Sequence, residues 1–147
     1  MCPTSINTFK HRARAQRGAA AVEMALMLPV LLLMVDGVLE FGLMMHNQSV
    51  LVSATHIAAR AGIPAGPAKL TVAQIAEMAR SYCTLHLISP GSAQTAVITV
   101  DQASVATYPA PLRVSVQYPF NGLLIGGLWG AFQSAPLLTA STVMYNE

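Results

Sequence analysis

Residues 16–29 read QRGAAAVEMALMLP, and this stretch decides the fold. A basic residue and a glycine lead into three alanines, after which Glu23 stands almost alone in front of a long apolar run. A carboxylate is costly inside a membrane, so its place at the start of such a run needs a physical reason. Every charge that precedes Glu23 is positive.

The composition indicates a membrane-associated protein. Charged residues make up 10% of the 147 residues and hydrophobic residues 54%, whereas ordinary soluble domains contain about 25% charged residues. The first 18 residues hold four basic residues and no acid. A basic segment beside an apolar helix stays on the cytoplasmic side of a membrane. A nucleic-acid-binding arm is the alternative, but the apolar run follows at once, so we expect no nucleic-acid partner.

The apolar run from Ala19 to Met45 contains no basic residue, and Pro29 is its only proline. As a helix it would extend roughly 40 Å, and the hydrocarbon core of a bilayer is about 30 Å thick. A cleaved secretory signal would need a small-x-small pattern soon after the apolar stretch. The chain continues instead as DGVLEFGLMMHNQ. We therefore expect the segment to remain as a membrane anchor.

The later sequence predicts a small domain outside the membrane. Apolar spacing at Val50, Ala54, Ile57, Ala58 and Ala61 extends the first helix, from about Ala19 to Ala61, and Gly62 stops it. A second helix follows over residues 71–88 with Thr71 as its N-cap. Alternating β-branched segments then predict three strands, at 96–105, 112–118 and 137–146. The expected fold is α+β, with a long transmembrane and amphipathic helix, a second helix and a small antiparallel sheet of about three strands.

This reading divides the chain into four parts. They are a basic leader (1–18), a transmembrane helix (19–45), an amphipathic continuation of that helix (46–62) and an extracytoplasmic α+β domain (63–147). The glycine-rich segment 120–132 has two readings: a loop packed on the sheet, or an exposed apolar surface that touches lipid or a partner.

No catalytic set is visible in the sequence. The histidines lack metal-ligand spacing, and no serine lies in a GxSxG setting. We expect no enzyme activity, no cofactor and no metal site. Cys2 and Cys83 fall on opposite sides of the expected membrane, so no disulfide is predicted. Cys83 is either buried or available for intermolecular pairing, and we expect burial.

The stretch RGAAAVEMALMLPVLLLMVDGVLEFG, residues 17–42, resembles the TadE-like pseudopilins of tight-adherence (Flp) pilus systems. The resemblance is strong over residues 16–62 and loose afterwards, where YPF at 118–120 and the C-terminal LLTASTVMYNE also look similar. It implies that a prepilin peptidase cuts between Gly18 and Ala19 and removes the leader. Many pilins carry phenylalanine where this chain has Ala19, but alanine is common in TadE-like proteins.

The resemblance also implies a role for Glu23. Cleavage would create an α-amino group on Ala19 with an ordinary pKa of about 8. In related pilins the carboxylate at this position pairs with the new N-terminus of a neighbouring subunit. Glu23 lies four residues after Ala19, about 6 Å along a helix, so it also reaches its own terminus. The alternative is a carboxylate that is solvated at the lipid headgroup boundary.

Asp36 and Glu40 share one face of the expected helix near its outer membrane interface. They read equally as solvated interface carboxylates or as partner contacts. The resemblance to the GxxEFG segment of TadE-like proteins singles out four residues for helix packing or partner contact: Gly37, Glu40, Phe41 and Gly42. Glycines at such positions allow helices to approach closely.

The resulting expectation is a TadE-like minor pseudopilin that takes part in assembly of a tight-adherence (Flp) type IV pilus. Its expected partners are the prepilin peptidase, other pilins or pseudopilins, the inner-membrane assembly platform and membrane lipid. Its expected location is the bacterial inner membrane, as a single-pass protein with a cytoplasmic N-terminus, periplasmic domain and possible incorporation in the pilus. The alternative is an unprocessed, membrane-anchored binding protein of the cell envelope.

Overall fold

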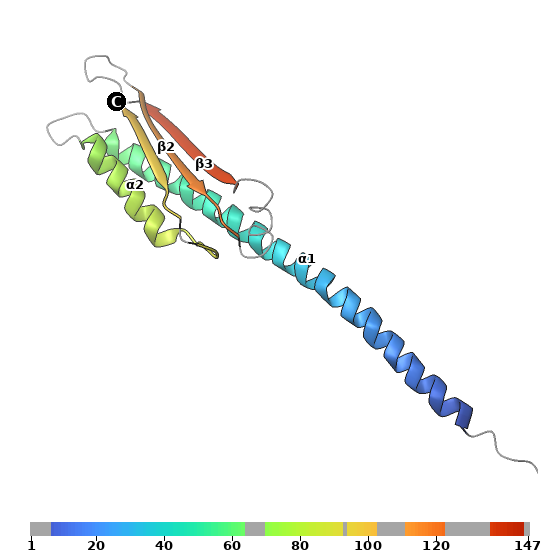
Figure 1. Ribbon diagram of the computed structural model, residues 1–147. Helices are drawn as coiled ribbons and strands as arrows, with labels where there is room; N and C mark the ends of the chain where they lie inside the picture. The colour runs from blue at the N-terminus through green and yellow to red at the C-terminus, as the bar shows by residue number, and fades with distance from the viewer. Residues whose placement is uncertain (1–6, 64–69, 93, 103–110, 123–135, 146–147) are drawn as a thin grey trace, which may run out of the picture. The chain divides into compact units, whose positions relative to one another are not determined.

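The computed structural model describes residues 7–63, 70–92, 94–102, 111–122 and 136–145, with the helical backbone alone for residues 7–17. In chain order the elements are α1 (Asn7–Gly62), α2 (Val72–His86), β1 (Val97–Gln102), β2 (Pro111–Pro119) and β3 (Leu137–Tyr145) (Figure 1). The predicted α+β fold, with one long apolar helix, a second helix and a three-stranded antiparallel sheet, is confirmed.

The first helix begins earlier than the sequence predicted. It starts at Asn7 rather than near Ala19, so the backbone of the basic leader is helical too. No proline or glycine occurs between Asn7 and Arg17, and lysine, arginine, alanine and glutamine all have favourable helix propensity. The helix ends at Gly62, the predicted stop. Pro64 follows two residues later, and proline commonly follows a helix end.

The internal contacts of the chain separate two units, Met1–Val38 and Leu39–Glu147. In the first unit, most of the described side chains of α1 are apolar and exposed; Glu23 is an exposed acid and Asp36 is half-buried. Leu26, Leu31 and Met34 are 68%, 61% and 67% exposed. By length and composition, α1 is able to cross a membrane, with a mean hydropathy of 2.2 over its most apolar stretch.

In the second unit, α2 is a well-capped amphipathic helix. Thr71 is its N-cap, as predicted, and accepts a hydrogen bond from the backbone N–H of Gln74. The Gln74 side chain accepts one from the Thr71 N–H in return, which completes a capping box. Ile75, Ala79 and Cys83 form the buried stripe of α2, so the expected burial of Cys83 is confirmed.

The sheet has the order β1-β2-β3, with both neighbouring pairs antiparallel. Val100 lies opposite Val114 on β2, and Val114 lies opposite Thr142 on β3. Burial alternates along β2, so that Leu112, Val114, Val116 and Tyr118 face the core. The period of two that predicted this strand is therefore the burial pattern of the structure.

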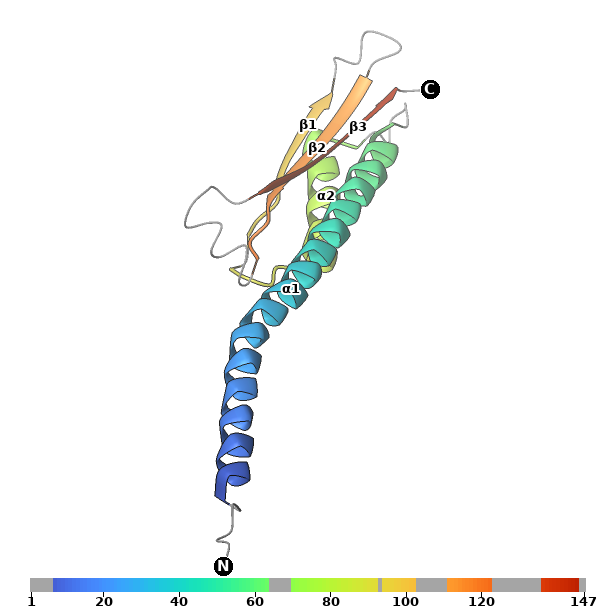
Figure 2. The same cartoon turned by 90° about the vertical axis from the view of Figure 1, so that its right-hand side faces the viewer.

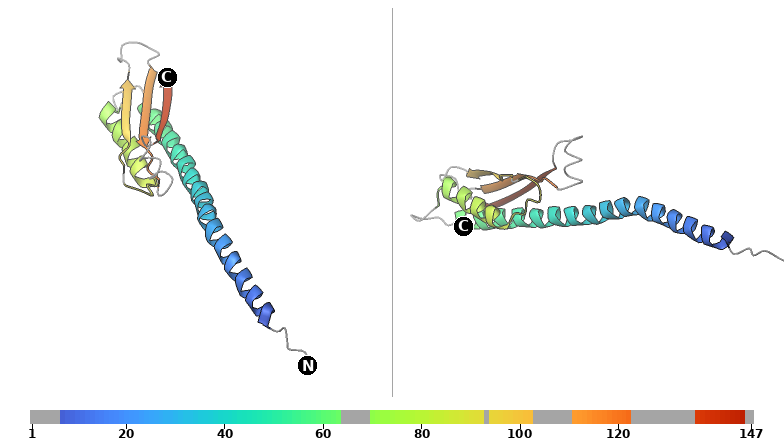
Figure 3. Two further views of the ribbon diagram at one scale, coloured as in Figure 1. Left: turned by 45° about the vertical axis from the view of Figure 1, so that its right-hand side comes forward. Right: turned by 60° about the horizontal axis from the view of Figure 1, so that its bottom comes forward.

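The core lies between the sheet and the two helices, which pack on the same sheet face (Figure 2). Leu51 and Ala54 of α1 join Cys83 of α2 and Tyr118 of β2 in one buried cluster. A second cluster joins Ala58 and Ala59 to Ile75, Leu112 and Val114. The opposite sheet face carries no element of the described chain (Figure 3).

The sequence predicted that Ile57 lies on the buried face of α1, and this prediction is wrong. Ile57 is 43% exposed, whereas Thr55 is completely buried. The buried face of α1 is rotated toward Leu51 and Thr55 because β3 packs on that side: the Thr55 hydroxyl lies 2.9 Å from that of Thr142. Of the apolar segment 120–132, Phe120 is buried in the core, and residues 123–132 lie outside the described residues.

Candidate processing and assembly site

Gly18 and Ala19, the predicted cleavage residues, are exposed on α1. A Cβ atom built on Gly18 would meet nothing within 4 Å. No other described part of the chain covers the helix surface at Gly18. The peptide bond between the two residues is part of a continuous helix, because α1 runs through it from Asn7.

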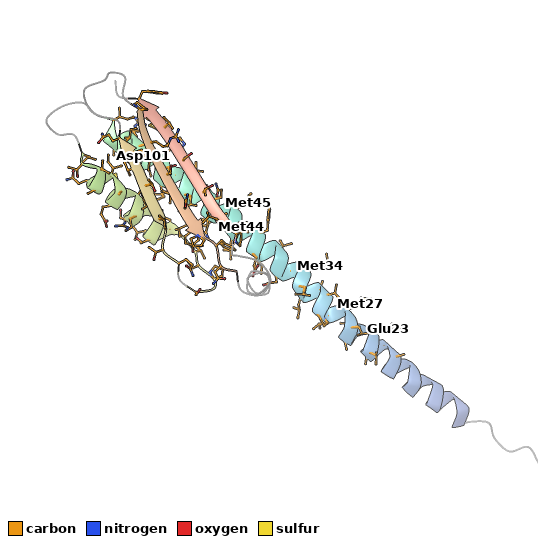
Figure 4. All side chains as sticks on the ribbon, turned by 45° about the horizontal axis from the view of Figure 1, so that its top comes forward. Glu23, Met27, Met34, Met44, Met45 and Asp101 are labelled. Atoms are coloured by element: carbon orange, nitrogen blue, oxygen red, sulfur yellow. The ribbon has the colours of Figure 1, made fainter. Side chains whose placement is uncertain are left out.

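Glu23 is exposed one helical turn beyond Ala19. Its side chain projects outward from α1, as do those of Met27 and Met34 (Figure 4). Within the part of the chain that the structure describes, no hydrogen bond or ion pair involves Glu23. The carboxylate is thus available for a charge supplied from elsewhere, and its neighbours on the helix surface are apolar.

The four residues of the GxxEFG segment do not act as one surface. Glu40 is only 8% exposed, while Phe41 is 62% exposed. Gly42 is exposed, and a Cβ atom there would meet nothing within 4 Å. Gly37 is half-buried. Phe41 and Gly42 therefore remain open for contact with a partner, whereas Glu40 faces its own chain.

The reading of Glu40 as a solvated interface carboxylate is wrong. Its carboxylate lies against the backbone of Gly122, just after β2: a Cβ atom on Gly122 would be 2.6 Å from both Oε1 and Oε2. A side chain at position 122 would therefore have to displace the Glu40 carboxylate from this place. Asp36 is half-buried, and its Oδ2 has no solvent exposure and no hydrogen-bond partner among the described residues.

Asn47 is a structural residue that sequence reasoning missed. It is completely buried, and its side-chain amide pairs with the backbone of Ile88 through two hydrogen bonds. Nδ2 donates to the Ile88 carbonyl at 2.8 Å, and Oδ1 accepts from the Ile88 N–H at 3.0 Å. The signal in the sequence was the polar run His46–Ser49, which interrupts an otherwise apolar helix.

Further hydrogen bonds hold the connection between α2 and β1 against the end of β2. The hydroxyls of Ser89 and buried Tyr118 bond to each other. The amide of Asn121 donates to the Ser92 hydroxyl at 2.7 Å, and the Gly91 N–H donates to the Asn121 carbonyl. Ser89 and Ser92 thus have structural partners in place of a catalytic base.

The described residues contain no group of three side chains of the kind that bind a metal ion. Burial raises the pKa of the Cys83 thiol, because desolvation disfavours the thiolate. The thiol is 1% exposed. A buried, protonated thiol is a poor nucleophile and a poor metal ligand.

These features define a class: an α+β protein with one exposed apolar helix able to cross a membrane, and no clustered metal-ligand set among its described residues. Residues 18–60 match the family described as TadE-like protein, so the resemblance inferred from the sequence is confirmed. The matched segment contains Gly18, Glu23, Glu40 and Asn47 and ends before the sheet. The family match and the long apolar helix fit a membrane protein associated with the Tad pilus. The chain has no significant match among curated proteins or solved structures.

Proposed function

We propose that this protein is a TadE-like minor pseudopilin, cut after Gly18 by a prepilin peptidase and active in assembly of a tight-adherence pilus. The observation that carries the proposal is the placement of Gly18 and Glu23 at the start of an exposed apolar helix. In this proposal the protein is the substrate of an enzyme and has no catalytic role itself. It crosses the inner membrane once, with its leader in the cytoplasm and its sheet in the periplasm.

Cleavage requires the helix to open at Gly18, since α1 is continuous there. Glycine is the weakest helix former apart from proline, by about 1 kcal/mol relative to alanine, so the helix opens most easily at this residue. No other described part of the chain covers the helix surface at this residue. The four basic residues of the leader keep the bond at the cytoplasmic face.

After cleavage, Glu23 supplies the counter-charge for the new amine on Ala19. An unpaired cation in a low-dielectric environment is costly, and an opposite charge within hydrogen-bonding reach removes much of that cost. Pairing with the amine of a neighbouring subunit would set the axial register between helices. Phe41 and Gly42 remain exposed on the same helix for contact with other pilins or the assembly platform.

Mass spectrometry of the membrane-extracted protein tests processing. We expect a mature N-terminus at Ala19 in cells that contain the peptidase, and the intact leader in cells that lack it. Gly18→Val should block cleavage without changing the fold, because its side chain meets open space. An intact leader in peptidase-positive, piliated cells would contradict the proposal and favour an unprocessed, membrane-anchored binding protein.

Piliation of Glu23 variants tests the assembly role separately. Glu23→Gln and Glu23→Ala should still be cleaved, but surface piliation should fall. The matched control is Glu77→Gln, which removes another exposed carboxylate, one that pairs with Arg80 on α2. Detection of tagged protein in sheared pili as well as membranes would show whether the subunit enters the fibre. Normal piliation of both Glu23 variants would remove this residue from the mechanism.

A further inference from the structure

Six large apolar side chains are exposed at one end of the Leu39–Glu147 unit, the end at which α1 enters the unit at Leu39. Each is between 45% and 78% exposed. We call this group the proximal collar, and its members are Leu39, Phe41 and Met45 on α1, Leu85 and Ile88 around the end of α2, and Leu137 at the start of β3.

Hydrogen bonds and close contacts bring the collar residues to one end of the unit. Ile88 is tied to α1 through the amide of Asn47. The backbone at Gly122 lies against Glu40 on α1. The Phe120 N–H donates to the Pro136 carbonyl, which places Leu137 beside the same segment. The C-terminal end of α2 and the start of β3 lie at this end of the sheet (Figures 1 and 3).

Two polar residues of α1 in this region, Glu40 and Asn47, face inward. Glu40 and Asn47 are 8% and 0% exposed, whereas their apolar neighbours Leu39, Phe41 and Met45 point out of the unit. His46 is an exposed neighbour. The folded unit therefore buries the Glu40 carboxylate and the Asn47 amide, and most of the exposed side chains between Leu39 and Met45 are apolar.

The exposed charges of the described unit lie outside the collar. Asp101 and Arg113 sit opposite each other on β1 and β2, at the far end of the sheet from Met44 and Met45 (Figure 4). Glu77 and Arg80 pair on α2 before its last turn, and Arg60 is close to the end of α1. A water-facing domain end would normally carry charges among its apolar groups.

The length of the apolar helix identifies what covers the collar. Residues 19–38 already provide the roughly 20 residues that a transmembrane helix needs. Apart from buried Glu40, residues 39–45 contain no charged or polar side chain, and they belong to the folded unit. They extend about 10 Å further along the helix, which is more than the roughly 5–7.5 Å depth of one headgroup layer. The chain therefore leaves the hydrocarbon core where the collar begins.

We propose that the proximal collar is seated in the headgroup and upper acyl layer of the bilayer, so that this end of the folded unit is a lipid-binding surface. This inference depends on α1 crossing a membrane, which is part of the proposed function. It does not depend on peptidase processing or on Glu23. Seating the collar in lipid fixes the height of the sheet above the membrane before assembly.

Site-directed spin labelling of the full-length protein tests this inference. Nitroxides are attached at Leu85→Cys, Ile88→Cys or Leu137→Cys in a Cys2→Ser background, with buried Cys83 left in place. The protein is reconstituted in phosphatidylcholine–phosphatidylglycerol vesicles. Collision of the label with oxygen, which concentrates in lipid, is compared with collision with a water-soluble nickel complex. Val143→Cys and Tyr145→Cys are the matched controls, since both are exposed apolar residues at the other end of β3.

We expect oxygen collisions to exceed nickel collisions at the collar and the reverse at the two control positions. Leu31→Cys reports on the membrane helix itself. Oxygen dominance at Leu31 with nickel dominance at the collar would overturn the inference and leave the membrane crossing intact. Nickel dominance at Leu31 would contradict the crossing. Shielding of collar labels from both reagents, with spin–spin broadening, would identify a second copy of the chain as the occupant and overturn the lipid assignment.

Discussion

The carboxylate of Glu40 lies directly against Gly122, so closely that a Cβ atom on the glycine would be 2.6 Å from both carboxylate oxygens. This contact joins α1 to the segment that follows β2. It places the carboxylate inside the folded unit, where Glu40 is 8% exposed, and not on the outer surface of the helix. Its neighbours Phe41 and Gly42 remain exposed.

We expect Gly122→Ala to lower the free energy of unfolding by about 1–3 kcal/mol, because the added methyl group displaces a buried carboxylate. Gly42→Ala is the matched control. Its methyl group meets open space in the middle of a helix, so stability should be unchanged or rise by up to about 1 kcal/mol. Thermal unfolding of the full chain in detergent, followed by circular dichroism, measures both. Equal effects of the two substitutions would contradict the Glu40–Gly122 contact.

Asn47→Ala should lower the free energy of unfolding by about 1–3 kcal/mol, since it removes a fully buried amide and leaves the part-buried N–H and carbonyl of Ile88 without their side-chain partners. Gln48→Ala, which removes one exposed bond to the Thr139 carbonyl, should cost only about 0.5–1 kcal/mol. Hydrogen exchange at the Ile88 amide provides a local readout. Unchanged protection of that amide in Asn47→Ala would show that the side chain does not hold the connection between α2 and β1.

The buried hydroxyl pair of Thr55 and Thr142 predicts a strongly non-additive double mutant. Thr55 donates to the Val52 carbonyl, so it accepts the hydrogen bond from Thr142. Thr55→Val alone leaves the buried Thr142 hydroxyl without its hydrogen-bond partner and should lower the free energy of unfolding by about 1–3 kcal/mol. Replacing both residues with valine removes both polar groups and should restore most of the lost stability. Additive losses in a double-mutant cycle would argue against a direct bond.

Stability should fall at alkaline pH because the pKa of the Cys83 thiol is raised by burial. The thiol of the unfolded chain ionises near pH 8.5. Below that pH both states are protonated and the full contribution to stability is present. As the pH rises toward and through the raised folded value, only the unfolded state gains from ionisation, so stability falls by at most about 1.4 kcal/mol per pH unit.

Cys83→Ala provides the control for this pH dependence, since the variant should show a flatter decline over the same range. Reaction of the folded Cys2→Ser protein with a thiol reagent at pH 8 should be slow and should speed up on unfolding. Rapid modification of the folded chain would show that Cys83 is accessible.

The elements of this fold could be read from local patterns. The stop at Gly62, the Thr71 cap and the strand alternation around Val114 each depend on residues close together in the chain. Backbone hydrogen bonding and capping are short-range, so a pattern of a few residues is sufficient to predict them. The placement of Gly18 and Glu23 on the exposed helix follows from the length and composition of the apolar run after Gly18.

The environments of the polar residues on α1 could not be predicted from the sequence and are known only from the folded chain. Glu40, Asn47 and Thr55 all look like helix-surface residues in the sequence, yet each is buried against a distant segment, at Gly122, Ile88 and Thr142 respectively. Helical periodicity assigns a residue to a face of the helix but does not say which segments arrive to cover that face. Burial of a polar group depends on which segments pack on that face and on the hydrogen bonds they form with it. Both are long-range properties of the packed molecule.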